Sequence, residues 1–228
     1  MKKKFLLFSA IFALLCFAVV AVYFIFFNVN INELAVQNVS EKGSSCYIAN
    51  SGQASAKVYS GQREEPYVLD GKHNQMTDFT LIVFRTNQIG VDSPTFIIDI
   101  NGEKYNGVLE TNPYDGSFVS DLQIMVDNNA TISLTVTVND DSYNFEMQNV
   151  SGDWQISFDD AMDIGIQDLN SEISLCLNGK ELNCELYVKA ISDTNGNFDN
   201  FFYYVSYIDV NQNSKGVVID VQTGEIIK

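Results

Sequence analysis

Histidine is almost absent from this 228-residue sequence, which has only His73. One histidine excludes a histidine-rich metal site and a HExxH peptidase, and a Ser/His/Asp triad would need His73 as its base. That residue stands in the polar segment "LDGKHNQMTD", where a solvated loop histidine is the ordinary outcome. Gly-rich phosphate loops, CxxC pairs and SxxK motifs are also missing. The sequence therefore predicts no catalytic residue, no metal ligand and no cofactor.

Basic residues are scarce as well. Lysine and arginine number 13 against 29 acidic residues, which gives a formal net charge of −16. Three of the basic residues are Lys2, Lys3 and Lys4, so residues 28–228 hold ten basic and 29 acidic residues, a formal charge of −19. Nucleic acid and anionic lipid headgroups are therefore poor partners. The acidic residues are spread along the chain, which is typical of a charge that maintains solubility.

One long hydrophobic run opens the chain, "FLLFSAIFALLCFAVVAVYFIFF", residues 5–27. As a helix it would be about 34 Å long, enough to cross a membrane. A cleaved signal peptide is the alternative, but no small-x-small cleavage site follows Phe27, and Leu15 before Cys16 does not fit a lipoprotein signal. The sequence predicts a single-pass plasma-membrane anchor, with the three lysines cytoplasmic and residues 28–228 extracytoplasmic.

Cysteine is rare, with four in the chain. Cys16 falls in the hydrophobic run, which leaves Cys46, Cys176 and Cys184. An odd number allows at most one intrachain disulfide and leaves one thiol. Cys176 and Cys184 are the candidate pair because they would close a short loop, while buried, reduced thiols remain the alternative.

Turn residues and β-branched residues divide the rest of the chain. Residues 28–55 are rich in Asn, Ser and Gly and predict a stalk with one short strand near Tyr47 and Ile48. Residues 56–150 hold short runs of β-branched and aromatic residues between turn-forming segments, as in "ATISLTVTV" (130–138). This spacing predicts an all-β antiparallel sandwich of immunoglobulin-like architecture.

The pattern changes at residue 151. Apolar residues at steps of three and four predict a helix with one apolar face: Met162, Ile166, Leu169, Ile173 and Cys176. Ser157 is the expected N-cap, with Asp160 completing a capping box. The segment "ISLCL" (173–177) before "NG" could instead be a strand entering a hairpin. Four strands follow, so residues 151–228 predict a small α+β domain with one helix on a four-stranded antiparallel meander.

This C-terminal third, about residues 153–228, resembles the PepSY-type domain. Ile156, Ser157 and Ala161 match the start of its helix, and its D-x-x-T-G-(E/K)-I hairpin is matched by Asp220, Thr223, Gly224, Glu225 and Ile226. The second small helix residue of the family falls at Gly165, which is a departure. The resemblance implies a non-catalytic module that restrains a peptidase or binds a component of the bacterial cell envelope, and it supplies no catalytic residue.

Together these features predict a non-enzymatic, membrane-anchored protein that binds or regulates an envelope protein or peptide. One alternative is a hydrolase that acts on cell-wall polymer through two carboxylates, since the chain has many acids although no pair stands out. The other is a structural or adhesive surface protein.

Overall fold

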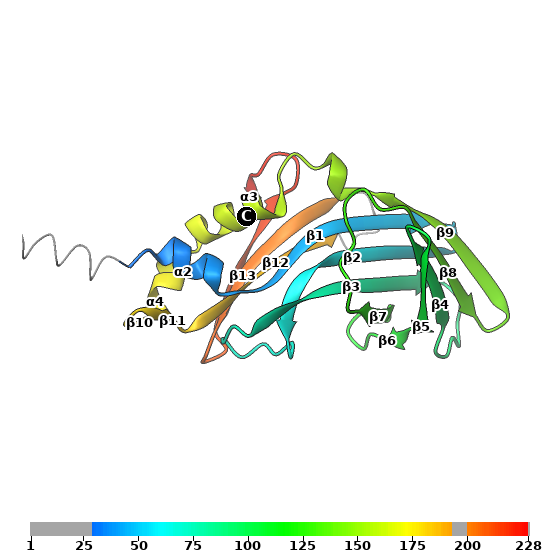
Figure 1. The fold of residues 1–228 in the computed structure, drawn as a ribbon, viewed down its shortest axis with the longest axis horizontal. Helices are drawn as coiled ribbons and strands as arrows, with labels where there is room; N and C mark the ends of the chain where they lie inside the picture. Colours follow the sequence, from blue (N-terminus) through cyan, green and yellow to red (C-terminus); the bar gives the residue numbers. More distant parts are fainter. Residues whose placement is uncertain (1–28, 193–199, 228) are drawn as a thin grey trace, which may run out of the picture.

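The chain forms one large, curved β-sheet flanked by short helices (Figure 1). The computed structural model describes residues 29–192 and 200–227. The helices are α2 (Ile31–Gln37), the 3-10 turn η1 (Ser151–Asp153), α3 (Phe158–Asp168) and α4 (Asn170–Leu175). The strands are β1 (Val39–Asn50), β2 (Ala54–Glu65), β3 (Gln75–Thr86), β4 (Thr95–Ile100), β5 (Glu103–Val108), β6 (Glu110–Thr111), β7 (Phe118–Leu122), β8 (Ile132–Val138), β9 (Asp141–Asn149), β10 (Leu177–Asn178), β11 (Glu181–Leu182), β12 (Cys184–Ser192), β13 (Phe201–Asp209), β14 (Ser214–Asp220) and β15 (Ile226–Ile227).

Three strands of 12 residues each, β1, β2 and β3, are the common centre of the sheet. At about 3.3 Å per residue each spans about 40 Å. The antiparallel register of β2 and β3 is unbroken from Ala54↔Thr86 to Glu65↔Gln75. On the far side of β3 the sheet continues through β7 to the edge strand β6.

The other side of β1 has two successive partners, which makes the sheet fork. The first part of β1 pairs in parallel with β12, ending at Lys42↔Val188. The pairing of β1 with β2 shifts register between Gly43 and Ser45. After this shift β1 pairs with β9 at Tyr47 and Ile48. One branch therefore runs β12-β13-β14-β15 and the other runs β9-β8-β4-β5.

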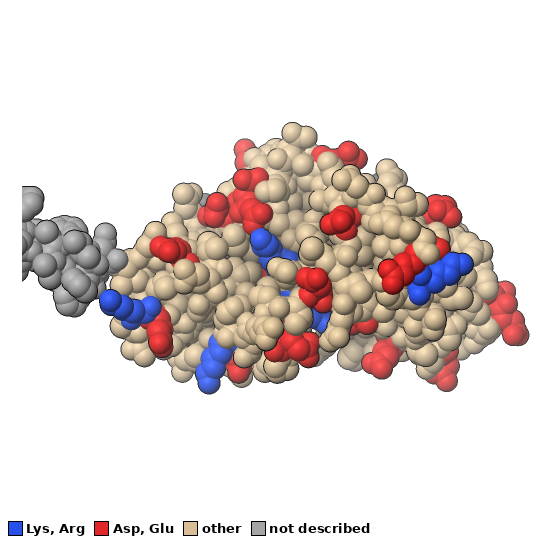
Figure 2. Space-filling model, viewed as in Figure 1, with Lys and Arg blue, Asp and Glu red and all other residues tan. Residues whose placement is uncertain are grey.

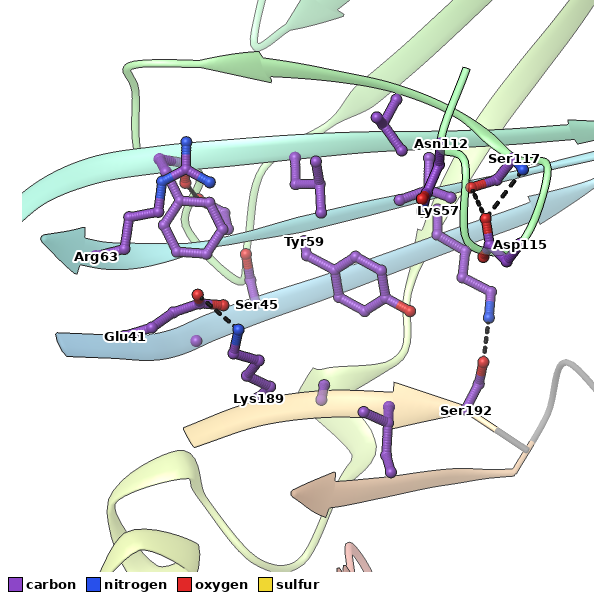
Figure 3. Close-up of a pocket in the computed structure, with 18 of the residues that line it drawn as sticks. Glu41, Ser45, Lys57, Tyr59, Arg63, Asn112, Asp115, Ser117, Lys189 and Ser192 are labelled. Atoms are coloured by element: carbon purple, nitrogen blue, oxygen red, sulfur yellow. Dashed lines mark hydrogen bonds and ion pairs between the residues drawn. The ribbon is translucent and has the colours of Figure 1, made fainter. Parts of the chain in front are cut away.

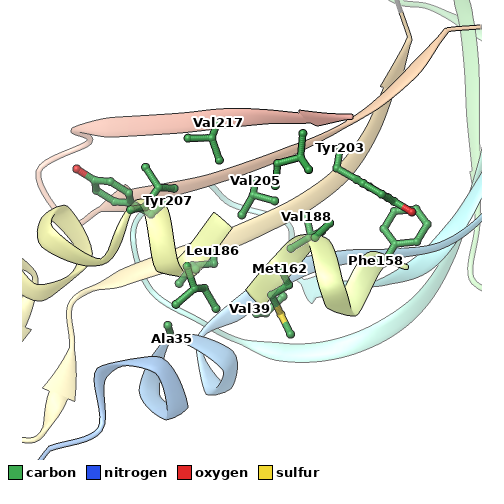
Figure 4. Close-up of a cluster of buried hydrophobic side chains, with 14 of the residues drawn as sticks. Ala35, Val39, Phe158, Met162, Leu186, Val188, Tyr203, Val205, Tyr207 and Val217 are labelled. Carbon is green, nitrogen blue, oxygen red and sulfur yellow. The ribbon is translucent and has the colours of Figure 1, made fainter. Parts of the chain in front are cut away.

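Each branch encloses its own hydrophobic core. The first core lies between α3 and the β12–β14 branch and includes Met162, Leu186 and Val205 (Figure 4). The second lies where the β9-β8-β4 branch packs over the central strands, with Val58, Ile82 and Phe84 fully buried. Strand β1 contributes Cys46 to the first core and Tyr47 to the second, because adjacent side chains on a strand point to opposite faces.

Helix α3 begins with both halves of the capping box expected from the sequence. The Asp160 backbone N–H donates to Ser157 Oγ at 3.1 Å, and the Ser157 N–H donates to Asp160 Oδ2 at 3.1 Å. The helix is shorter than the apolar periodicity predicts, since it ends at Asp168 and the separate helix α4 follows Leu169. The chain then turns at Gly179 between the two-residue strands β10 and β11.

The predicted arrangement of a sandwich followed by a separate α+β domain is wrong. The segment 28–55, expected to be a stalk, contains α2 and β1, and β1 pairs with both branches. The helix on a four-stranded meander is present, but its strand β12 continues the large sheet through β1. The two halves are therefore joined by backbone hydrogen bonds along a shared strand.

The predicted membrane anchor has no counterpart among the described residues. Residues 5–27 lie outside the described residues, and within the described ranges no helix is long and apolar enough to cross a membrane. The longest of them, α3, has 11 residues, about 16 Å, or roughly half of a hydrocarbon core. The structure thus gives no support to a single-pass membrane protein or to a plasma-membrane location.

Candidate binding groove at the fork of the sheet

The residues of the PepSY-like signature lie together and hold the hairpin β14–β15 against α3. Asp220 Oδ1 accepts hydrogen bonds at 2.8 Å from the backbone N–H groups of Gln222 and Thr223. Gly224 has a φ of +72°, and a Cβ there would lie 3.2 Å from Ile156 Cδ1. Ala161 is fully buried in the first core. These contacts are structural, and Ile156, Ser157 and Asp160 also line a cavity of about 350 Å³.

The three described cysteines are free thiols in this structure. Cys176 and Cys184, the candidate disulfide pair, lie beside each other, and the Cys176 thiol is in hydrogen-bonding contact with Cys184. Burial raises the pKa values of Cys46, Cys176 and Cys184, so each thiol is a poor nucleophile at neutral pH.

A groove of about 570 Å³ opens where β1 leaves β12. Its size is that of a small-molecule or short-peptide site. Its floor is one face of β2 and β3, including Tyr59, Leu81 and Val83, and this is the opposite face to the second core. Its sides are the end of β12, the segment from Asn112 to Val119, and Phe158 at the start of α3.

Four basic side chains converge on this groove: Lys57, Arg63, Arg85 and Lys189. Lys189 Nζ lies 3.0 Å from Glu41 Oε2. Arg63 is 2.8 Å from Asp121, and Arg85 is paired with Asp115. Figure 3 shows Lys189 and Lys57 reaching into the groove from opposite ends. Four cations thus gather here in a chain with a net charge of −16, and three of them are paired with the carboxylates Glu41, Asp115 and Asp121.

Lys57 is the most buried of the four cations, with 8% of its surface exposed. It donates a hydrogen bond to Ser192 Oγ, and its Nζ lies 5.4 Å from the centre of the Phe201 ring. Burial lowers the pKa of Lys57. A buried ammonium is already weakly hydrated, so Lys57 would lose little further hydration when an anion binds beside it.

Aromatic rings support the cations at the other end of the groove. Arg63 lies over the rings of Tyr67 and Phe79, at 5.2 and 5.0 Å from their centres. Lys189 lies over Tyr67 and Tyr187 at 5.2 and 5.0 Å. These contacts hold the long basic side chains in place, which reduces the entropy lost when a ligand binds them.

Two fully buried glutamates, Glu64 on β2 and Glu185 on β12, lie next to this end of the groove. Glu64 Oε2 accepts hydrogen bonds from Ser40 Oγ at 3.1 Å and from the Asn74 N–H at 2.9 Å. Glu185 Oε1 accepts from the Gly71 N–H at 2.8 Å. The second oxygen of each carboxyl has no hydrogen-bond partner among the described residues. Burial raises the pKa of Glu64, and the charge of Glu185 adds to the effect.

No pattern in the sequence predicted the groove as a whole. Its signal is present on β2, where Lys57, Tyr59 and Arg63 are separated by even numbers of residues and therefore share one face. The other cations come from β3 and β12, and only the folded sheet brings them to the same place. His73, the one histidine, is exposed in the loop after β2.

Comparisons of this chain with family models, curated proteins and solved structures find no match.

Proposed function

We propose that this protein is a non-catalytic binding protein whose groove at the fork takes an anionic ligand with an apolar body. The observation that carries the proposal is the placement of charge. Residues 28–228 contain ten basic residues, and four of them line this one groove. Figure 2 shows acidic side chains spread over the visible face and basic side chains at a few separate points. A local concentration of cations in an acidic protein favours anions at that site.

The ion pairs already present in the groove do not prevent this. Arg85 and Asp115 are both partly exposed, and such pairs contribute about 0–1 kcal/mol. A ligand carboxylate would join two or more cations in a network. The apolar floor of Leu81, Val83 and Tyr59 would contact the rest of the ligand.

The hydrolase alternative has weaker support in the groove. Its two carboxylates, Glu41 and Asp115, are each paired with a cation. Burial acts to raise the pKa of Asp115, but the hydrogen bonds from Ser117 and the charge of Arg85 outweigh it and lower that pKa. A general acid for glycoside hydrolysis needs a raised pKa.

The resemblance of residues 153–228 to PepSY-type domains favours the same kind of function, because that family is associated with binding and restraining peptidases. A protein or peptide partner therefore fits both the groove and the resemblance.

Two anionic probes test the proposal on the full chain. One is 8-anilinonaphthalene-1-sulfonate, and the other is a labelled heptapeptide with alternating glutamate and valine, compared with its glutamine analogue. We expect the anionic probes to bind, to weaken as salt is added, and to lose about tenfold in affinity in Lys189→Gln. Lys104→Gln, on the exposed face of β5, is the matched control and should bind normally. Equal affinity in Lys189→Gln and the unmodified chain for both probes would overturn the proposal.

A further inference from the structure

The groove lies along the edge of β12 as well as over the central strands. Four consecutive residues of β12, Lys189 to Ser192, line it. Side chains of a strand alternate between two faces, so a cavity over one face would be lined by every second residue. Lining by four in succession means that the cavity runs along the edge of the strand. The floor residue Tyr59 extends toward this edge (Figure 3), and its hydroxyl is in hydrogen-bonding contact with Ser192.

This edge has no strand beside it in the described ranges. β12 pairs with β13 from Cys184 to Ser192 without a register shift, but it pairs with β1 only as far as Val188. The Leu186 N–H donates to Asn38 O at 2.9 Å, so the backbone groups of Leu186 point toward β1. The backbone N–H and C=O groups of successive residues in a strand point to alternate sides. Those of Ala190 and Ser192 therefore point the same way as those of Leu186, into the groove.

The charges beside this edge select the kind of strand that would fit. Lys189 stands at its beginning and Lys57 contacts its end at Ser192. Four strand residues span about 13 Å, and alternate side chains of an added strand would all face the same side. An extended peptide with acidic residues at alternate positions would thus place carboxylates near both lysines.

The geometry points to β-strand addition: the groove binds an acidic, extended peptide that pairs with the free edge of β12 at Ala190 and Ser192. This inference rests on the proposed function and names its ligand class. Backbone hydrogen bonds would supply affinity, and the lysines at the two ends would select acidic sequences. The second branch of the sheet cannot fill this edge, because β9 pairs with β1 only from Tyr47 onward.

Amide hydrogen exchange of the full chain, with and without the glutamate–valine heptapeptide, tests the pairing directly. We expect the N–H groups of Ala190 and Ser192 to exchange at least about tenfold more slowly with the peptide present. Those of Lys189 and Ile191, which point toward β13, should change much less. A version of the peptide with N-methyl groups at every second residue, matched to the edge, should lose about tenfold in affinity.

Ala190→Pro is the matching change in the protein. It removes one N–H that faces the groove and none that faces β13, so the fold should persist while peptide affinity falls. Binding of anilinonaphthalene sulfonate without binding of the peptide would overturn the inference and leave the proposed function standing. Peptide binding with unchanged amide exchange at Ala190 and Ser192 would also overturn the inference and leave the proposed function standing. Failure of both probes would remove the proposed function and the inference together.

Discussion

Glu64 and Glu185 place two carboxyl groups in the interior beside the groove, where both are fully buried. The described hydrogen bonds satisfy one oxygen of each carboxyl and leave the other unpartnered. Burial and the charge of Glu185 both disfavour the ionised form of Glu64. Folding therefore favours the protonated form of Glu64, and this residue links stability to pH.

We predict that the free energy of unfolding contains a contribution from Glu64 that declines as pH rises. Because burial and Glu185 raise the pKa of Glu64 in the folded state, this contribution is fully present below the ordinary glutamate pKa of about 4.3. It is lost as pH increases through the raised value. Urea denaturation between pH 4 and 8 would measure it. In Glu64→Gln this side chain no longer titrates, so the dependence should be flatter. Identical pH profiles for the two proteins would contradict the prediction.

At the scale of elements, the hairpin β14–β15 and the start of α3 form one unit. The Ile156 N–H donates to Val221 O at 3.1 Å, and the hairpin turn at Gly224 packs against Ile156 and Ile164. Asp220 and Gly224 therefore hold a turn that closes against the helix. Ile156 and Gly224, which resemble the two halves of the PepSY-type motif, therefore lie side by side although they are far apart in the sequence.

We predict that Gly224→Val lowers the free energy of unfolding by about 1 kcal/mol or more, because a β-branched residue is strained at positive φ. The added side chain would also press on Ile156 and Ile164. Denaturation followed by the fluorescence of Trp154, which packs against the first core, would measure the change. Gly224→Asn is the control, since asparagine tolerates this conformation and should cost less. An unchanged unfolding midpoint in Gly224→Val would show that the turn does not require glycine.

At the scale of the whole molecule, the shared strand β1 joins the two cores. Adjacent residues of β1 enter different cores, as Cys46 and Tyr47 do. If one branch unfolded, β1 would lose hydrogen-bond partners along its edge and would expose apolar side chains. The other branch would then be destabilised, because it also packs and pairs with β1. Such coupling predicts a single cooperative transition rather than the two transitions of independent domains.

A mild substitution in the second core tests this coupling. We predict that Ile82→Val, at a fully buried site, destabilises the protein by about 1 kcal/mol. The loss should also appear in the unfolding transition of Trp154, the only tryptophan, which lies beside the first core. Thr95→Ser, at an exposed position on β4, is the control. A Trp154 transition that stays in place while the second core melts earlier would show that the two halves unfold independently.

Local patterns in the sequence were sufficient to determine most elements. The alternation of Ile132 to Val138 predicts β8, the Ser157–Asp160 pair predicts the start of α3, and the residues around Gly224 predict the final hairpin. These features depend on neighbours within a few residues, through side-chain period, capping and turn conformation, so they can be recognised from the sequence alone.

The centre of the sheet and the groove depend on tertiary contacts between segments that are distant in the sequence. The sequence of β1, "VSEKGSSCYIAN", is rich in small and polar residues, and its strand conformation comes from pairing with β2, β12 and β9 rather than from its own propensity. The fork exists because β1 changes partners after Lys42. Lys57, Arg63, Arg85 and Lys189 meet there through pairings between distant segments, and no local pattern records such pairings.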